Sequence, residues 1–443
     1  MKRARLFCLL IIIAESIFVS AQTQYEVLWN FAGVPNDGAV PTGSLISDHS
    51  GNLYGTTSSG GSSRSIGGTV FELSPNGDGS WSETVLYNFC SRYVNRKCED
   101  GATPQAGLTF DRRGNLYGTT QYGGTQNCPF NTNGCGTVFE LLPQSRPGAA
   151  WAERVLYNFC MIEANNLCMD GAAPLSQLTI DSSGNLYGTT SVGGTGQGSG
   201  GTVFELSRGS GGVTHTILYS FCSLGQGSIC PDGNMPVAGV TFDSAGNLYG
   251  TTKYGGTLGG TGAGTLYQLS SGSSGWTETV LIGLGAPQKG DAPLGGVTLD
   301  KLGTLYSTFS GGGANNAGGL FKYSSKNKTT QTYSFNGTNG NEPAAGILID
   351  RKNATVYGTT LQGGMNQAGL VFAMTAGAEE KVLYSFCSQP NCIDGVAPTA
   401  SVIQDTSGNI YGTASLGGAN GQGVVFELMP QNPNSSAVHG GLR

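Results

Sequence analysis

The 443-residue sequence predicts an all-β fold, a seven-bladed β-propeller of four-stranded blades, from three observations. One unit recurs seven times, each unit holds four short β-type runs, and an extra run near the N-terminus matches the fourth run of a unit. A repeated unit that cannot bury its faces alone must pack against its neighbours, so the repeat decides the architecture.

The repeat is anchored by a tyrosine in a run that reads LYGTT or a close variant. Successive anchors lie 51 to 70 residues apart, and they are Tyr54, Tyr117, Tyr187, Tyr249, Tyr306, Tyr357 and Tyr411. Four antiparallel strands repeated seven times describe a propeller. The runs are too short for a transmembrane barrel, and the period is too long for a β-helix.

The second unit shows the four runs most clearly, at residues 107–110, 115–119, 137–141 and 155–159. The first two runs are joined by Asp111-Arg112-Arg113-Gly114. Aspartate at the start of such a turn accepts local N–H groups, and glycine at its end supplies a positive φ. Each unit is therefore expected to begin with a tight hairpin.

The two ends of the repeat array complement each other. The array opens on residues 27–31, which match a fourth strand, and ends on residues 424–428, which match a third. We expect the N-terminal strand to complete the last blade and close the ring. The predicted propeller spans residues 22–430, and residues 431–443 form a flexible tail.

The first 21 residues predict a secretory signal peptide. Lys2, Arg3 and Arg5 precede an apolar run at residues 6–13, and small residues at 19–21 offer a cleavage site. A membrane helix is the alternative, but the run is short and Glu15 interrupts it. We expect a secreted, periplasmic or extracellular protein with no membrane span after cleavage.

The charge balance is acidic and sparse. The chain has 22 Lys and Arg against 28 Asp and Glu, and loss of the signal moves the formal net charge from −6 to −8. Nucleic-acid binding needs clustered cations, so this surface argues against a nucleic-acid partner. We expect a monomer.

Ten cysteines remain once Cys8 leaves with the signal, and they fall into local pairs. An even count, local spacing and an export signal predict disulfides. Zinc is the alternative, but the pairs lack CxxC spacing and the chain has three histidines. The predicted pairs are Cys90–Cys98, Cys128–Cys135, Cys160–Cys168, Cys222–Cys230 and Cys387–Cys392.

Strand order predicts that all five disulfides lie on one face. Four pairs fall in connections from a fourth strand to the next first strand, and one falls between a second and a third strand. Both kinds of connection leave a propeller on the same side. Rigid variable loops on a repeated scaffold are typical binding sites, and protection from extracellular proteases is the alternative role.

Two groups of polar residues are candidate ligand sites. Arg92, Tyr93, Arg96 and Lys97 form the densest basic cluster, which could meet an anionic polysaccharide or could be a solvated loop tip. A second group of aspartates precedes the innermost strands and could bind calcium at the channel mouth, or could be turn residues. These aspartates are Asp37, Asp100, Asp170, Asp232, Asp291 and Asp394.

The sequence offers no catalytic residue. His49, His215 and His439 are scattered, and no GxSxG motif occurs. A dinucleotide-like glycine pattern at residues 196–201 joins two strands and opens no helix, so we interpret it as chance.

The motifs GNLYGTT, GG and GTVFEL, followed by D-G-A-x-P, resemble the GloVer (Gloeo/Verruco) tandem-repeat family of exported bacterial proteins. The strand–turn–strand core is also similar to NHL-type propeller repeats. The resemblance implies a propeller and export. It implies no established activity and carries over no catalytic residue.

Together these features favour an exported module that binds a carbohydrate or an extracellular protein through its disulfide-bearing loops. An enzyme in the channel, such as a metal-assisted lactonase or a polysaccharide lyase, is the first alternative. A structural surface protein is the second. Calcium is the only cofactor that the pattern raises.

Overall fold

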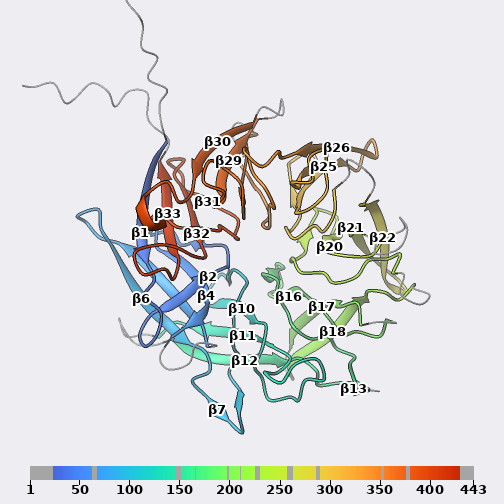
Figure 1. Cartoon of the computed structure of the whole chain (residues 1–443). Helices are drawn as coiled ribbons and strands as arrows, with labels where there is room; N and C mark the ends of the chain where they lie inside the picture. The colour runs from blue at the N-terminus through green and yellow to red at the C-terminus, as the bar shows by residue number, and fades with distance from the viewer. Residues whose placement is uncertain are drawn as a thin grey trace, which may run out of the picture.

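A computed structural model (Figure 1) gives the fold of the predicted propeller. The signal peptide and the C-terminal tail predicted from the sequence lie outside the described residues. The described ranges are 23–61, 67–144, 151–164, 166–196, 199–209, 211–224, 230–256, 263–285, 290–350, 354–375 and 380–429.

Seven antiparallel sheets are arranged around a central axis, which confirms the predicted seven-bladed propeller (Figure 1). The innermost strands are β3 (Ile46–Ser47), β9 (Thr109–Phe110), β15 (Thr179–Ile180), β19 (Thr241–Phe242), β23 (Thr298–Leu299), β27 (Leu348–Ile349) and β31 (Ile403–Gln404). The second strands are β4 (Leu53–Gly60), β10 (Leu116–Thr120), β16 (Leu186–Thr190), β20 (Leu248–Thr252), β24 (Thr304–Phe309), β28 (Val356–Thr360) and β32 (Ile410–Ala414).

The third and fourth strands of each blade are longer than its innermost strand. The third strands are β5 (Thr69–Pro75), β11 (Thr137–Leu142), β17 (Thr202–Gly209), β21 (Thr265–Gly272), β25 (Gly319–Ser324), β29 (Leu370–Met374) and β33 (Val424–Met429). The fourth strands are β6 (Trp81–Asn88), β12 (Ala152–Asn158), β18 (Gly212–Ser220), β22 (Gly275–Gly283), β26 (Thr329–Ser334), β30 (Glu380–Ser385) and, for the last blade, β1 (Gln24–Asn30).

The N-terminal strand closes the ring, as the sequence predicts. Strand β1 pairs antiparallel with β33, from Gln24 opposite Met429 to Asn30 opposite Val424. In Figure 1 the blue first strand lies beside the red last one. The first and last blades also share a hydrophobic core that includes Phe31 and Phe71, so closure buries apolar surface as well as pairing backbone.

The threonines of the LYGTT motif link each blade to the next. The hydroxyl of Thr56 in β4 donates to the carbonyl of Ala106 ahead of β9, with an oxygen–oxygen distance of 2.8 Å. Equivalent bonds of 2.7 to 3.1 Å run from Thr119, Thr189, Thr251, Thr308 and Thr359. The backbone ahead of six of the innermost strands thus accepts hydrogen bonds from the preceding blade. Only two residues of the predicted four-residue inner run pair with the second strand of their own blade.

The glycine of LYGTT and the phenylalanine of GTVFEL are matched in shape. A Cβ on Gly118 would lie 2.5 Å from the Cζ atom of Phe139, closer than any real contact. The ring of Phe139 is fully buried and reaches across this glycine into the core shared by neighbouring blades. This glycine and this phenylalanine therefore recur in the repeat because the ring packs over the glycine in the core between blades.

The Asp-x-x-Gly turns lie together on one side of the ring, here called the turn face. In the second blade Asp111 accepts hydrogen bonds from the N–H groups of Arg113 and Asn115 at 2.8 and 2.9 Å. The same carboxylate accepts from the Asn115 side chain at 2.8 Å and from the Tyr117 hydroxyl at 3.1 Å. Equivalent networks surround Asp48, Asp181, Asp243 and Asp405.

All five predicted disulfides are formed, and they lie on the opposite side, here called the stapled face. Its connections contact one another, because the N–H of Gly124 donates to Cys98 and that of Gly194 donates to Cys168. The short elements on this face are β2 (Gly38–Pro41), β7 (Tyr93–Val94), β8 (Lys97–Cys98), β13 (Glu163–Ala164), β14 (Leu167–Cys168) and the 3₁₀ turn η1 (Pro390–Cys392). Within the described ranges, no helix has the length and apolar character needed to cross a bilayer.

Candidate functional site

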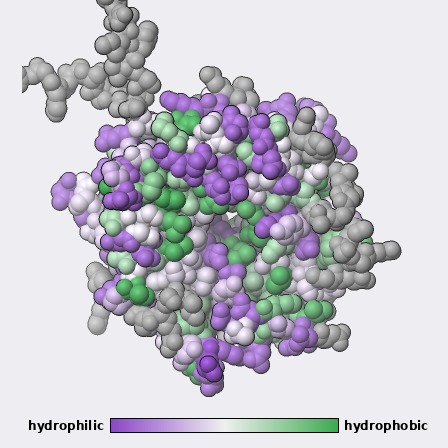
Figure 2. Space-filling view, in the orientation of Figure 1, coloured by the Kyte–Doolittle hydropathy of each residue, from purple (hydrophilic) through white to green (hydrophobic). Residues whose placement is uncertain are grey.

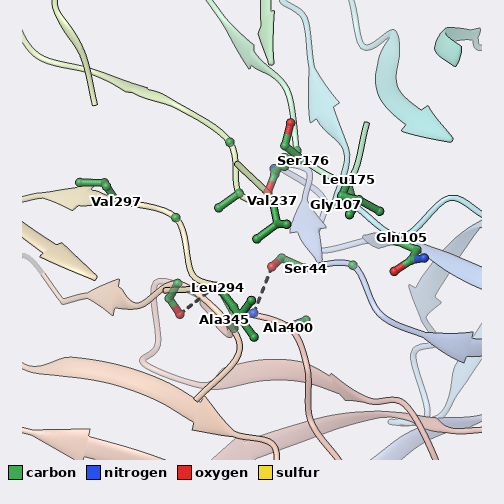
Figure 3. Close-up of a pocket in the computed structure, with 18 of the residues that line it drawn as sticks. Ser44, Gln105, Gly107, Leu175, Ser176, Val237, Leu294, Val297, Ala345 and Ala400 are labelled. Carbon is green, nitrogen blue, oxygen red and sulfur yellow. Dashed lines mark hydrogen bonds between the residues drawn. The ribbon is translucent and has the colours of Figure 1, made fainter. Parts of the chain in front are cut away.

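The ring encloses a central cavity of about 350 Å³. The space-filling view is hollowed at this point (Figure 2), and the inner edges of all seven blades contribute to its wall (Figure 3). The polar side chains of the wall include Ser44, Gln105, Ser176, Gln177 and Ser401. None of the lining residues, which all lie in described ranges, is acidic, basic, histidine or cysteine.

Much of the polar surface of the cavity already holds the ring together. The backbone N–H of Ser401 donates to the Ser44 hydroxyl at 3.1 Å, and the Ser401 hydroxyl donates to the Gly346 carbonyl at 2.9 Å (Figure 3). The Gln177 side chain donates to the Leu108 carbonyl at 2.7 Å. The wall can therefore meet a small neutral polar molecule, but its lining residues supply neither the paired carboxylates of glycoside hydrolysis nor carboxylate or imidazole ligands for a metal.

The structure does not bring the six predicted aspartates together at the channel. Four of them, Asp100, Asp170, Asp232 and Asp394, are fully buried in the stapled loops. Asp37 accepts from the N–H groups of Ala32 and Gly38, and Asp291 lies against Gly311. None of the six lines the central cavity.

Asp100 shows what these buried carboxylates do. It accepts from the Tyr87 hydroxyl at 2.9 Å, from the Ser91 N–H and hydroxyl at 2.9 and 2.7 Å, and from the Arg92 N–H at 3.3 Å. Asp394 accepts an equivalent set from Tyr384, Ser388 and Gln389. Each carboxylate thus ties its loop to a fourth strand. Both oxygens of Asp100 and of Asp394 accept from donors of the protein, whereas Asp232 accepts from Tyr219 and Ser223 through Oδ2 and its buried Oδ1 has no partner.

The predicted basic cluster lies at the tip of the β7–β8 hairpin, but its cations differ in their surroundings. Arg92 forms an ion pair with Glu153 of the next blade at 2.8 Å, and the Lys97 ammonium donates to the Thr125 carbonyl at 2.9 Å. Arg96 is exposed and Tyr93 is 41% exposed. Arg96 and Tyr93 are therefore the members of the cluster best placed for an external ligand.

Exposed apolar side chains gather on the stapled face. Of the fourteen large hydrophobic side chains exposed in the described ranges, eleven lie in connections of this face. Large contiguous apolar patches mark interaction sites, whereas single exposed hydrophobic side chains are normal on a protein surface, so the informative feature here is that most of them share one face. The eleven are Val34, Tyr93, Val94, Phe130, Met161, Ile162, Leu224, Tyr254, Met365, Ile393 and Leu416.

A series of ionisable residues lies between the blades, at one repeated position of the fourth strands. Glu83, Glu153, His215 and Glu278 pair with Leu73, Leu141, Leu206 and Leu269 of the third strands. Burial, reinforced by the charges of Asp37 and Asp232, raises the pKa of Glu83 and of Glu278 to about 8. Burial raises the pKa of Glu153 to about 7, against the opposing effect of Arg92.

His215 belongs to this series of residues between the blades. Its ring stacks on Tyr157, with centroids 4.4 Å apart and planes 9° apart. Burial lowers the pKa of His215 to about 4, so the imidazole is neutral at physiological pH. His49 lies in the Asp48 turn, as expected, and His439 lies outside the described residues.

An arginine-bearing groove on the turn face was not predicted from the sequence. It has a volume of about 560 Å³ and lies between the second and third blades. Its charged lining residues are Arg112, Arg113 and Arg208 together with Asp111 and Asp181. Arg208 also pairs with the buried Glu140 at 3.1 Å and lies over the Tyr117 ring. The available signal was the Arg-Arg pair in a turn that reads Ser-Ser in the next repeat.

Residues 17–167 and 258–440 match the Gloeobacter/Verrucomicrobia repeat. A sequence comparison with curated proteins finds no match. Among solved structures, a GH74 enzyme from Niastella koreensis is similar, with 18% identity and a TM-score of 0.53 over 90% of this chain, which spans about half (53%) of that one.

Two candidate 6-phosphogluconolactonases also match in shape. The one from Bacteroides uniformis has 12% identity and a TM-score of 0.47 over 76% of this chain and 83% of its own. The one from Bacteroides fragilis has 14% identity and a TM-score of 0.47 over 82% and 94%. At these identities the likeness of the GH74 enzyme concerns the propeller fold alone, and no activity follows from any of the three.

Proposed function

Because the chain belongs to the Gloeobacter/Verrucomicrobia repeat family and folds as a seven-bladed propeller, we propose that it is an exported binding module. The stapled face recognises a carbohydrate or a cell-surface protein outside the cytoplasm. The observation that carries the proposal is the gathering of eleven of fourteen exposed hydrophobic side chains on that face.

Six of the eleven side chains lie in connections that a disulfide and a buried aspartate fix to the fourth strand, so these connections lose little conformational entropy when a partner binds. The six are Tyr93, Val94, Met161, Ile162, Leu224 and Ile393. Five disulfides are also typical of proteins in oxidising compartments, which supports export.

The chemistry of the face favours a protein over a sugar. Eight of the eleven side chains are aliphatic or methionine, and three are aromatic. Aliphatic surface is buried most effectively against another protein, whereas sugars stack on aromatic rings. Carbohydrate is the second candidate ligand class, because three aromatic side chains, Tyr93, Phe130 and Tyr254, are exposed on the same face. Arg96 beside Tyr93 would add affinity for an anionic polymer.

The enzyme alternative draws no support from the cavity. A lactonase or lyase needs an acid, a base or a metal ligand at the reacting centre. The wall of the cavity presents hydroxyl, amide, aliphatic and backbone groups instead.

The test is binding of the fluorescently labelled mature protein to two targets: a panel of neutral and anionic oligosaccharides, and cells of the producing organism before and after surface proteolysis. Loss of cell binding on proteolysis identifies a protein partner. If Arg96→Glu weakens binding to an anionic oligosaccharide and Arg113→Glu, on the turn face, does not, the ligand is an anionic glycan. Turnover of an oligosaccharide, or binding to neither target, contradicts the proposal.

A further inference from the structure

Two of the five disulfides touch each other. Cys128–Cys135 lies between β10 and β11, and Cys160–Cys168 lies between β12 and β15. The sulfur atoms of Cys135 and Cys168 are 3.5 Å apart, and those of Cys128, Cys135 and Cys168 all lie within 4.8 Å of one another. The other three disulfides lie in connections that follow the first, third and sixth blades.

The four cysteines differ in access. Cys135, Cys160 and Cys168 are 1%, 3% and 0% exposed, whereas Cys128 is half-buried. An external thiolate therefore reaches Cys128 first. Attack at that sulfur expels Cys135 as the leaving thiolate, and this thiolate is formed in contact with the sulfur of Cys168.

We infer that these four cysteines form a thiol–disulfide exchange site whose substrate is an external thiol. In the first step the external thiolate bonds to Cys128 and the Cys128–Cys135 bond breaks. In the second, the Cys135 thiolate bonds to Cys168, and Cys160 leaves as a thiolate that takes a proton. A second external thiol then releases Cys128 as a thiol and leaves as an external disulfide.

Together these steps are one two-electron reduction of the protein by two external thiols. Two external thiols become one disulfide, and two protein disulfides become one disulfide, Cys135–Cys168, plus the thiols of Cys128 and Cys160. The same steps in reverse let an external disulfide restore the original pairs. The site goes beyond the proposed binding function, and neither depends on the other.

The surrounding backbone holds the new pair in place. The carbonyl of Cys135 accepts from the Ala173 N–H at 2.8 Å, and that of Cys168 accepts from Gly171 and Gly194 at 3.1 and 2.9 Å. The Cys135–Cys168 bond spans 33 residues, whereas the original bonds span 7 and 8. A crosslink across a longer loop restricts the unfolded chain more, so the exchanged pair, once formed, stabilises the fold more than either original bond does alone.

Limited reduction of the native protein tests the inference. A monothiol is added until about one disulfide in five has opened, free thiols are blocked with N-ethylmaleimide, and the unreduced digest is read by mass spectrometry. We expect a Cys135–Cys168 crosslinked peptide with label on Cys128 and Cys160, while the other three disulfides serve as internal controls. Label on Cys128 and Cys135 with Cys160–Cys168 intact, or equal opening of all five disulfides, overturns it.

A double variant tests the geometry without a reductant. In Cys128→Ser/Cys160→Ser we expect Cys135 and Cys168 to pair, so that no thiol of the denatured protein takes up label. The matched control, Cys90→Ser/Cys222→Ser, leaves Cys98 and Cys230 in different connections, and both should be labelled. Two free thiols in the first variant, with a melting curve that shows it folded, also overturn the inference.

Discussion

The two faces of the ring differ in how closely their connections repeat from one blade to the next. On the turn face, the same Asp–Asn–Tyr network recurs in five blades with nearly the same distances. On the stapled face, the connections differ in length, crosslinking and exposed side chains. Residues that repeat around the ring therefore hold it together, and residues that vary are the ones that we propose for recognition.

Removing the closing strand should lower the stability most, because it opens the ring that carries both faces. Deletion of residues 22–32 removes β1, its pairing with β33 and the buried Phe31. We expect loss of cooperative unfolding or a severe fall in melting temperature, measured by circular dichroism. A nearly unchanged melting temperature would contradict the closure of the ring by β1.

Removing one disulfide should separate the roles of the two faces. For Cys222→Ser/Cys230→Ser, which opens a loop of eight residues, the loop-entropy model gives a loss of about 2.5 kcal/mol in the free energy of unfolding. We expect this loss in chemical denaturation, together with weaker partner binding. A loss of stability with full binding would show that this disulfide serves only the fold.

A substitution on the turn face should lower stability without weakening partner binding. Asp111→Ala removes four hydrogen bonds, and we expect it to lower the free energy of unfolding by about 2 kcal/mol while leaving binding unchanged. The control is Asp78→Ala, in the exposed hairpin between β5 and β6, which should have a much smaller effect. Weakened binding in Asp111→Ala would remove the distinction between the faces.

The buried glutamates between the blades predict a gradual dependence on pH. Burial raises the pKa of Glu83 and Glu278 from 4.5 to about 8 in the folded protein. The folded state thus holds protons that the unfolded state releases, so the contribution of these groups to stability is full below pH 4.5 and is lost as the pH rises from 4.5 through about 8. Glu278→Gln should flatten this slope in melting curves, whereas the exposed Glu163→Gln should leave it unchanged.

Much of the fold could be predicted because the repeat carries it. The tyrosine spacing, the extra strand at residues 27–31 and the strand order predict the ring, its closure and the common face of the disulfides. The side-chain directions of the aspartates could not be predicted. Whether Asp100 faces the channel or its own loop depends on Tyr87, a partner thirteen residues away in another strand.

The contact between Cys135 and Cys168 escaped prediction for a similar reason. Local spacing correctly pairs each cysteine with its neighbour in sequence. It says nothing of which loops touch, because that depends on how the connection after β10 lies against the connection after β12. The varied residues of the stapled face are thus the part of the molecule for which a repeat gives the least information.

The central claim, that the stapled face is the binding face, is tested most directly by two matched triple variants. One is Met161→Ser/Ile162→Ser/Leu224→Ser on the stapled face, and the other is Val213→Ser/Leu302→Ser/Val382→Ser, also exposed but elsewhere. Each single change should alter stability by no more than about 0.5 kcal/mol. We predict that the first triple variant binds cells of the producing organism at least about tenfold more weakly, from three lost apolar contacts, and that the second binds as the unaltered protein does. Equal binding by both, or loss in the second alone, would contradict the account.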